Sequence, residues 1–199
     1  TAREMIQEGN WWNTTMNLEQ RLEKPPLPTW LTALSVNYFG GLDSLFALRF
    51  PAALSAMFMV FFFFGLIKTL SSEKYLPLIG GAVMATSLLV IQQARTNSWD
   101  IYTHVFMVGS IWQLLVSFKT NAFKNLFYAI LFMGLSILSK GPVSLFALWI
   151  PFLIAYGIGF GFNTLKLNWK KIGLVLLFGL LIGFLWNIII HITETAASE

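Results

Sequence analysis

The chain has 199 residues, of which 56% are hydrophobic and 11% charged, and its mean hydropathy is +0.68. Soluble domains carry about 25% charged residues, so this composition excludes an ordinary soluble protein and indicates a polytopic membrane protein. We expect no nucleic-acid partner. There are no cysteines, which excludes disulfides and thiolate metal sites. The chain begins with Thr1 and has no signal sequence, so we expect a piece of a longer protein.

The first part of the chain is polar. We expect an amphipathic helix from Ala2 to Glu8, with Trp11 and Trp12 following it as anchors at the membrane interface. The next segment, Pro28 to Phe39, is apolar but too short to span a membrane by itself, so we expect a short helix in the outer leaflet. Residues 1–44 are therefore predicted to form an outer-face loop that contains juxtamembrane helices.

Six apolar stretches follow, and a membrane span takes roughly 20 such residues. The expected spans are Leu45 to Leu70, Leu76 to Ala94, Asp100 to Phe118, Leu126 to Ser139, Val143 to Phe162 and Ile172 to Ile192. The fourth is short, and its start is the least defined boundary, but Lys124 and Lys140 can snorkel from its ends. We therefore expect an all-α transmembrane bundle over residues 45–192 and the start of a further outer-face loop at 193–199.

Charged residues divide between two sets of connections. One set carries seven lysines, namely Lys68, Lys74, Lys119, Lys124, Lys166, Lys170 and Lys171, with Glu73 as its one acid. The other set carries the remaining cations, Arg3, Arg21, Lys24, Arg49, Arg95 and Lys140, and eight acids, Glu4, Glu8, Glu19, Glu23, Asp43, Asp100, Glu194 and Glu199. The positive-inside rule places the lysine set in the cytoplasm and the mixed set on the outer, periplasmic or lumenal, side.

The segment from Glu23 to Pro28 holds three prolines directly before an apolar helix. Each proline restricts the residue before it to extended geometry, so Glu23 and Lys24 are fixed on a stiff backbone at the membrane boundary. There Lys24 is placed to bind a lipid phosphate while Glu23 orients the phosphate or a sugar hydroxyl. An ordinary charge pair at a helix start is the alternative.

Two further outer-face turns carry candidate residues. Arg95 and Asp100 lie in a tight loop between two spans, where Asp100 is placed to act as a general base, to bind a sugar hydroxyl or simply to cap a helix. Lys140 precedes a Gly-Pro turn and is placed to neutralise a phosphate leaving group, or to snorkel. His104 and His191 have no partners at metal-ligand spacing, so we expect no metal site.

These motifs resemble the bacterial membrane glycosyltransferases related to the lipid A aminoarabinose transferase and the protein O-mannosyltransferases, a family with the multi-span GT-C fold. The resemblance runs in order over nearly the whole chain. The matching segments are Ala2-Arg3-Glu4-Met5, Gly9 to Trp12, Glu23 to Leu27, Trp30 to Leu34, Phe39-Gly40, Leu48 to Pro51, Ala94-Arg95 with Asp100, and Ser139 to Pro142.

The resemblance implies the N-terminal portion of a GT-C enzyme of the bacterial inner membrane. Such an enzyme moves a sugar from a polyprenyl-phosphate-linked donor to lipid A, a protein or another glycan on the periplasmic face. Lys24 is expected to bind the donor phosphate, Asp100 to lie in the active cavity, and Arg95 and Lys140 to shape its electrostatics. The chemistry adds Glu23 and Asp100 as carboxylates that activate the acceptor hydroxyl, and it demands no cofactor.

One departure affects activity. The family's principal catalytic aspartate lies a few residues before the position of Thr1, after a first membrane helix, and the family's later spans and C-terminal outer domain are also absent. We therefore expect this fragment to be inactive alone. The alternatives are a transporter or flippase for a lipid-linked substrate, which predicts charges near the middle of the spans, and a noncatalytic membrane protein.

Overall fold

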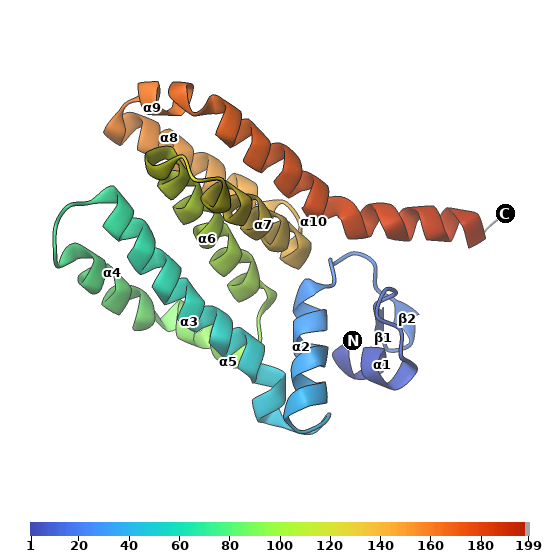
Figure 1. Ribbon diagram of the computed structural model, residues 1–199. Helices are drawn as coiled ribbons and strands as arrows, with labels where there is room; N and C mark the ends of the chain where they lie inside the picture. Colours follow the sequence, from blue (N-terminus) through green and yellow to red (C-terminus); the bar gives the residue numbers. More distant parts are fainter. Residues whose placement is uncertain (198–199) are drawn as a thin grey trace.

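The computed structural model is almost entirely helical. It describes the backbone of residues 1–197 and the side chains of residues 1–192. Glu199 and the side chain of Glu194 therefore lie outside the described residues. In chain order the elements are α1 (Ala2–Glu8), β1 (Thr15–Met16), β2 (Glu19–Gln20), α2 (Leu27–Phe39), α3 (Leu45–Leu70), α4 (Leu76–Ala85), α5 (Leu88–Thr96), α6 (Trp99–Thr120), α7 (Phe123–Lys140), the π-helical turn η1 (Leu145–Trp149), α8 (Ile150–Phe160), α9 (Phe162–Leu167) and α10 (Trp169–Ala197). The long helices form an elongated bundle, with the N-terminal segment beside the projecting end of α10 (Figure 1).

Among the described residues, four helices are long and apolar enough to cross a membrane: α3, α6, α7 and α10 as far as Ile192. Helices α4 and α5 together form a fifth candidate span, bent by 51° at their junction. The remaining expected span is a shorter apolar helix, Leu145–Phe160. The prediction of an all-α polytopic membrane protein is confirmed, with four or five long spans and one short apolar helix where six spans were expected.

Local backbone geometry explains these differences. Ser87 is extended, and the hydroxyl of Thr86 donates to the carbonyl of Ala82 at 2.8 Å, so the helix stops before α5 begins. A hydroxyl that bonds back to the preceding turn competes with the helix and bends it. At the short span, α7 begins at Phe123 because Asn121 closes α6 in the left-handed conformation. The expected start at Leu126 is therefore three residues late.

Helix α6 occupies the centre of the bundle. It packs against α3 and α7, and 67% of its most apolar stretch is buried, compared with 28% for α3 and 22% for α10. Its buried side chains form the main core with those of α7; they include Val105, Met107, Ile111, Leu114, Leu115, Met133 and Ile137. The position of α6 is therefore set by its neighbours along its whole length.

Helices α7 and α10 approach each other closely through glycines. The four-residue spacing of Gly179 and Gly183 predicts helix packing, and the structure confirms it. A Cβ added at Gly183 would lie 2.5 Å from Ile137, and one added at Gly179 would lie 2.6 Å from Met133. Gly134 of α7 faces Ile182 in the same way. The two backbones can lie this close only because these positions lack side chains.

Polar contacts of Glu4 join two elements within the N-terminal segment. Helix α1 has the predicted bounds, and the Glu4 carboxylate accepts hydrogen bonds from the Thr15 hydroxyl at 3.0 Å and the Asn17 N–H at 2.7 Å. Partial burial raises the pKa of Glu4, but these hydrogen bonds outweigh that effect and lower it below its usual value. Glu4 thus ties α1 to the β1–β2 hairpin, an element that sequence analysis did not predict.

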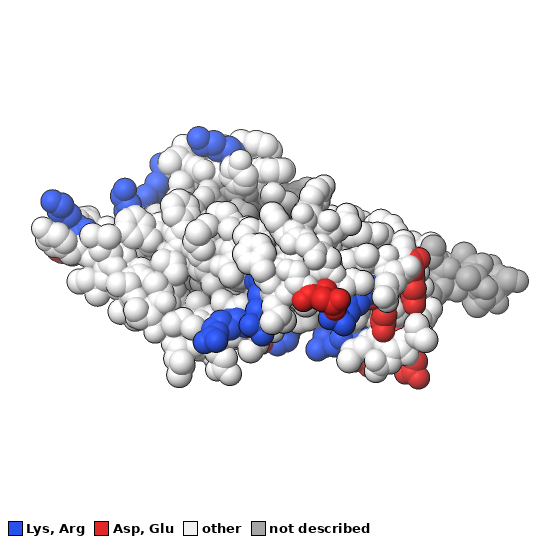
Figure 2. Space-filling model, turned by 90° about the horizontal axis from the view of Figure 1, so that it is seen from below, with Lys and Arg blue, Asp and Glu red and all other residues white. Residues whose placement is uncertain are grey.

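Polar groups also tie helices together at the lysine-rich end. Lys171 of α10 donates to the Ser117 carbonyl at 2.7 Å and to Asn121 at 2.6 Å, and Lys119 of α6 donates to the carbonyl of Thr69 in α3. In the view of Figure 2, blue cations stand nearly without acids towards one end, and red and blue atoms lie together towards the other. The described members of the two charge sets deduced from the sequence therefore lie at opposite ends of the bundle.

Replacement of Gly183 by leucine should destabilise the protein, because overpacking a tight helix contact costs about 1–3 kcal/mol. Thermal unfolding in detergent measures the effect as a lower Tm for Gly183→Leu. Gly173→Leu, on the same helix, is the matched control, since nothing lies within 4 Å of its added Cβ. Equal melting temperatures for the two variants would contradict the close packing of α7 on α10.

Candidate functional site

An ion pair joins the first turn of α6 to the last residue of α7. Lys140 donates to Asp100, and their side chains are 36% and 34% exposed, so both remain within reach of a ligand. Ser98 is the N-cap residue of α6: its hydroxyl accepts the N–H of Asp100 at 3.3 Å and lies 3.3 Å from the second carboxylate oxygen. Capping is therefore the role of Ser98, and the Asp100 carboxylate points to Lys140.

The turn after Lys140 is locked onto α6. Gly141 has a φ of 80°, which favours glycine, and its N–H donates to the carbonyl of Ile137 at 2.6 Å. The buried hydroxyl of Ser136 donates to the Thr103 carbonyl at 2.7 Å and lies 2.8 Å from the hydroxyl of Ser144. These contacts hold the end of α7 beside the first turns of α6. They thereby fix the backbone position of Lys140.

Trp99 brings cations of the N-terminal segment to this pair. Lys24 Nζ lies 5.4 Å from the centre of its indole ring, and the guanidinium carbon of Arg21 lies 5.6 Å from it. A cation within about 6 Å of an indole face is attracted by the ring's quadrupole. Trp99 directly precedes Asp100, so the residue that these two cations contact is the neighbour of the residue that Lys140 pairs with. We refer to Arg21, Lys24, Trp99, Asp100 and Lys140 as the cation–tryptophan cluster.

The proline frame expected around Lys24 is present. Pro25 and Pro26 are buried, and α2 begins directly after them at Leu27. Lys24 is half-buried, whereas Glu23 is exposed and has no ion pair or side-chain hydrogen bond within the described part of the chain. The structure therefore brings Lys24 into the cluster and leaves the Glu23 carboxylate available to solvent or to a ligand beside it.

Indole N–H groups hold the segment that carries these residues. Trp30 of α2 donates to the carbonyl of Trp11 at 2.6 Å, and Trp186 of α10 donates to the carbonyl of Trp12 at 3.1 Å. The rings of Trp12 and Trp30 also meet edge to face, with centroids 5.9 Å apart. The tandem tryptophans expected at the interface therefore connect the N-terminal segment to two helices.

A side-chain network connects α2 to the start of α6. Asn97 closes α5 in the left-handed conformation, donates to the Thr32 hydroxyl at 3.1 Å and accepts from the Tyr102 hydroxyl at 2.6 Å. The Tyr102 side chain is fully buried. This network fixes the loop that contains Ser98 and Trp99, and it thereby sets the distance between the α2 segment and Asp100.

Arg95 lies apart from the cluster, although the sequence placed it in the same loop as Asp100. It is exposed in the last turn of α5 and lines a surface hollow together with Arg49, Leu88, Ile91, Gln92 and Thr96. Among the described residues, no hydrogen bond or ion pair joins Arg95 to Asp100 or Lys140. A substrate-binding role for Arg95 stays a prediction.

No sequence pattern singles out Arg21 or Trp99 as a site residue. The signals available were that Trp99 stands directly before Asp100 and that Arg21 stands three residues before Lys24. Neither signal shows that the two segments meet, because a cation–π contact between distant parts of a chain has no sequence pattern. The cluster as a whole offers three cations, a carboxylate and an aromatic face, which suits an anion attached to an apolar group.

One protein family and two relatives match most of the chain. The family described as dolichyl-phosphate-mannose-protein mannosyltransferase matches residues 23–188. An uncharacterized protein of Aquifex aeolicus (strain VF5) is 27% identical over 98% of this chain and 38% of its own length. A Shewanella sediminis (strain HAW-EB3) protein named undecaprenyl phosphate-alpha-4-amino-4-deoxy-L-arabinose arabinosyl transferase is 24% identical over 97% of this chain and 35% of its own.

Solved structures show the same fold. ArnT from Cupriavidus metallidurans matches in its apo state with a TM-score of 0.77 at 19% identity, over 98% of this chain and 36% of that one. The same protein bound to undecaprenyl phosphate matches with a TM-score of 0.74 at 21% identity and the same coverage. The chain therefore has the architecture of the GT-C fold and spans little more than a third of the proteins it matches.

Removal of the Tyr102 hydroxyl should loosen the loop before α6. Tyr102→Phe leaves the Asn97 carbonyl without its donor, and we expect the free energy of unfolding to fall by about 1–2 kcal/mol. Chemical denaturation in detergent measures this change. Tyr38→Phe is the control, because Tyr38 is 79% exposed and should tolerate the change; equal effects in both variants would contradict the structural role of the network.

Proposed function

Because the chain belongs to the dolichyl-phosphate-mannose-protein mannosyltransferase family, we propose that it forms the donor-phosphate end of a membrane glycosyltransferase. The enzyme moves a sugar from a polyprenyl-phosphate-linked donor to a hydroxyl of a lipid, a protein or a glycan. ArnT, which shares the fold, has been solved with undecaprenyl phosphate bound, and this supports a donor of that class. Activity belongs to the whole protein, of which the chain supplies one part.

The observation that carries the proposal is the convergence of Lys24 and Lys140 on neighbouring residues. Lys24 lies over Trp99, and Lys140 pairs with Asp100, the next residue. The two lysines come from segments that are far apart in the sequence, one from the segment before α2 and one from the end of α7. Lys24 over the indole and Lys140 at the next residue supply charge for a phosphate, and the indole supplies an apolar surface for the first part of its prenyl chain.

The chemistry requires a cationic environment at the leaving group. The acceptor oxygen attacks the anomeric carbon, the bond from that carbon to the phosphate oxygen breaks, and the bond's electron pair leaves with the polyprenyl phosphate. Lys24 and Lys140 stabilise the negative charge that develops on this phosphate. The proton of the acceptor hydroxyl passes to a carboxylate base.

The two candidate carboxylates differ in availability. Asp100 already accepts from Lys140 and Ser98, so it holds Lys140 in position and orients a sugar hydroxyl. Glu23 is exposed beside Lys24 and is the better placed of the two to take up a proton. Arg95 contributes to the field at the same membrane surface.

The charges at the two ends of the bundle support one orientation in the membrane. Seven lysines with one acid at the end opposite the cluster favour a cytoplasmic location for that end. The cluster then faces the periplasm in a bacterial inner membrane. A transporter is less consistent with the chain, because no Asp, Glu, Lys or Arg lies in the middle of the four long described helices.

Replacement of Lys24 by alanine should reduce sugar transfer by about 100-fold or more, because the developing charge on the phosphate loses a preorganised cation. Transfer from a polyprenyl-phosphate-linked sugar is measured with the protein as its gene encodes it. Lys74→Ala, at the opposite end of the bundle, is the control and should transfer at the normal rate. Normal transfer by a folded Lys24→Ala protein would sink the proposed phosphate site; transport of the lipid without any transfer would favour the transporter.

Asp100 and Lys140 should behave as a unit. Asp100→Asn and Lys140→Gln each disturb the position of the remaining partner, so we expect the double variant to lose much less transfer activity than the product of the two single losses. A double-mutant cycle on the transfer rate measures this coupling. Independent, multiplying losses would show that the pair does not act together.

A further inference from the structure

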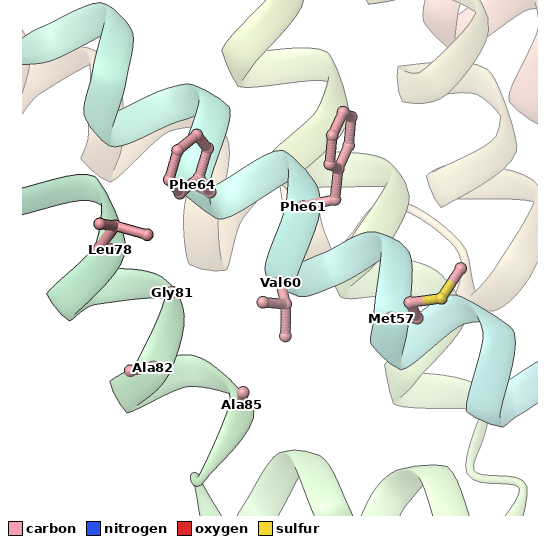
Figure 3. Close-up of a pocket in the computed structure, with 8 residues that line it drawn as sticks. All are labelled: Met57, Val60, Phe61, Phe64, Leu78, Gly81, Ala82 and Ala85. Carbon is pink, nitrogen blue, oxygen red and sulfur yellow. The ribbon is translucent and has the colours of Figure 1, made fainter.

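A groove separate from the cation–tryptophan cluster runs between α3 and the bent α4–α5 pair. One hollow in it, of about 640 Å³, is lined by Met57, Val60, Phe61, Phe64, Leu78, Gly81, Ala82 and Ala85 (Figure 3). A second hollow of about 270 Å³ shares Met57, Val60 and Ala85 with the first and extends to Arg95. The hollow that Arg95 shares with Arg49 continues from there. The three hollows thus form one path along the bundle.

The walls of this path are apolar over most of its length. Small residues leave the space open: Gly81, Ala82 and Ala85 on α4, and Ala53 and Ala56 on α3. In Figure 3, Val60 points from α3 towards α4, whereas Phe61 points away from it. The groove lies along helices that are apolar enough to cross a membrane, so its long axis runs through the hydrocarbon region.

The polar end of the groove is cationic. Arg49 and Arg95 are both exposed there, and no Asp or Glu lines the hollow they share. Neither guanidinium has an ion pair or side-chain hydrogen bond among the described residues. Arg49 lies in the second turn of α3 and Arg95 in the last turn of α5, so both stand where these helices reach the membrane boundary.

We propose that this groove binds an anionic glycerophospholipid, with its phosphate between Arg49 and Arg95 and one acyl chain between α3 and α4. The guanidinium fork matches phosphate oxygens in bidentate geometry. The apolar path below it matches a hydrocarbon chain in polarity, and the combination of a cationic head and an apolar tail specifies a lipid. The site is distinct from the cluster, and its occupancy does not depend on sugar transfer.

Native mass spectrometry of the protein as its gene encodes it tests the proposal. The protein is released from nanodiscs of phosphatidylcholine and phosphatidylglycerol, and the phosphatidylglycerol retained per molecule is counted. The wild type should retain one tightly held molecule. Arg49→Gln/Arg95→Gln should weaken retention about tenfold or more, since charge-assisted hydrogen bonds to one phosphate are lost.

Two further variants test whether retention depends on the arginine pair specifically and on the apolar groove. Lys68→Gln/Lys74→Gln makes the same change in net charge at the other end of the bundle and should keep the lipid; an equal loss there would mean general attraction to anionic membranes and overturn the proposal. Ala85→Phe fills the groove without a charge change and should also lose the lipid. Retention of the lipid by Ala85→Phe would place the acyl chain outside this groove and overturn the proposal.

The identity of the retained molecule provides the remaining outcomes. No retained lipid in the wild type, a polyprenyl phosphate in its place, or full displacement by millimolar inorganic phosphate would each overturn the assignment. Because lipid retention is measured without sugar transfer, a failure of the proposed enzyme function would leave this result unaffected, and the reverse also holds.

Discussion

The burial of α6 in the middle of the bundle is the constraint on which the site depends. Backbone groups in a bilayer must be hydrogen-bonded internally, so the chain crosses as helices, and their mutual positions are set by side-chain packing. α6 is buried over about two thirds of its apolar stretch. Its first turn, with Trp99 and Asp100, is consequently fixed relative to α3 and α7. The end of α7 follows, because Ser136 is bonded to the carbonyl of Thr103.

The N-terminal segment reaches this fixed point through contacts that are mainly structural. Arg3 donates to the carbonyl of Leu42 at 3.0 Å, and Glu4 holds the hairpin. The carbonyls of Trp11 and Trp12 are held by indoles of α2 and α10. Arg3 and Glu4, which belong to the Ala2-Arg3-Glu4-Met5 motif, therefore stabilise the fold of the N-terminal segment. Under the proposed function, the chemistry falls to the residues around Trp99.

The cations of the mixed-charge end form two environments with different chemistry. Lys24 and Lys140 meet an indole and a carboxylate, which fixes their positions and suits a phosphate that must be held and released. Arg49 and Arg95 stand at the end of an apolar groove without a described acidic partner, which suits a lipid headgroup that stays bound. If both proposals hold, one membrane surface binds a reacting lipid and a resident lipid in separate environments.

The sequence by itself determined the membrane class, the bounds of α1, the approximate spans, the two charge sets and the proline frame of Lys24. These features depend on composition, hydropathy and local backbone restriction, all of which are properties of contiguous residues. Only the tertiary structure decided that α4 and α5 are separate, that Thr15 and Gln20 pair in a hairpin, and that Lys24 lies over Trp99 while Arg95 lies beside Arg49. Arg95 and Asp100 are close in sequence, but they lie on different helices around the turn at Asn97, and the packing of those helices sends their side chains to different neighbours.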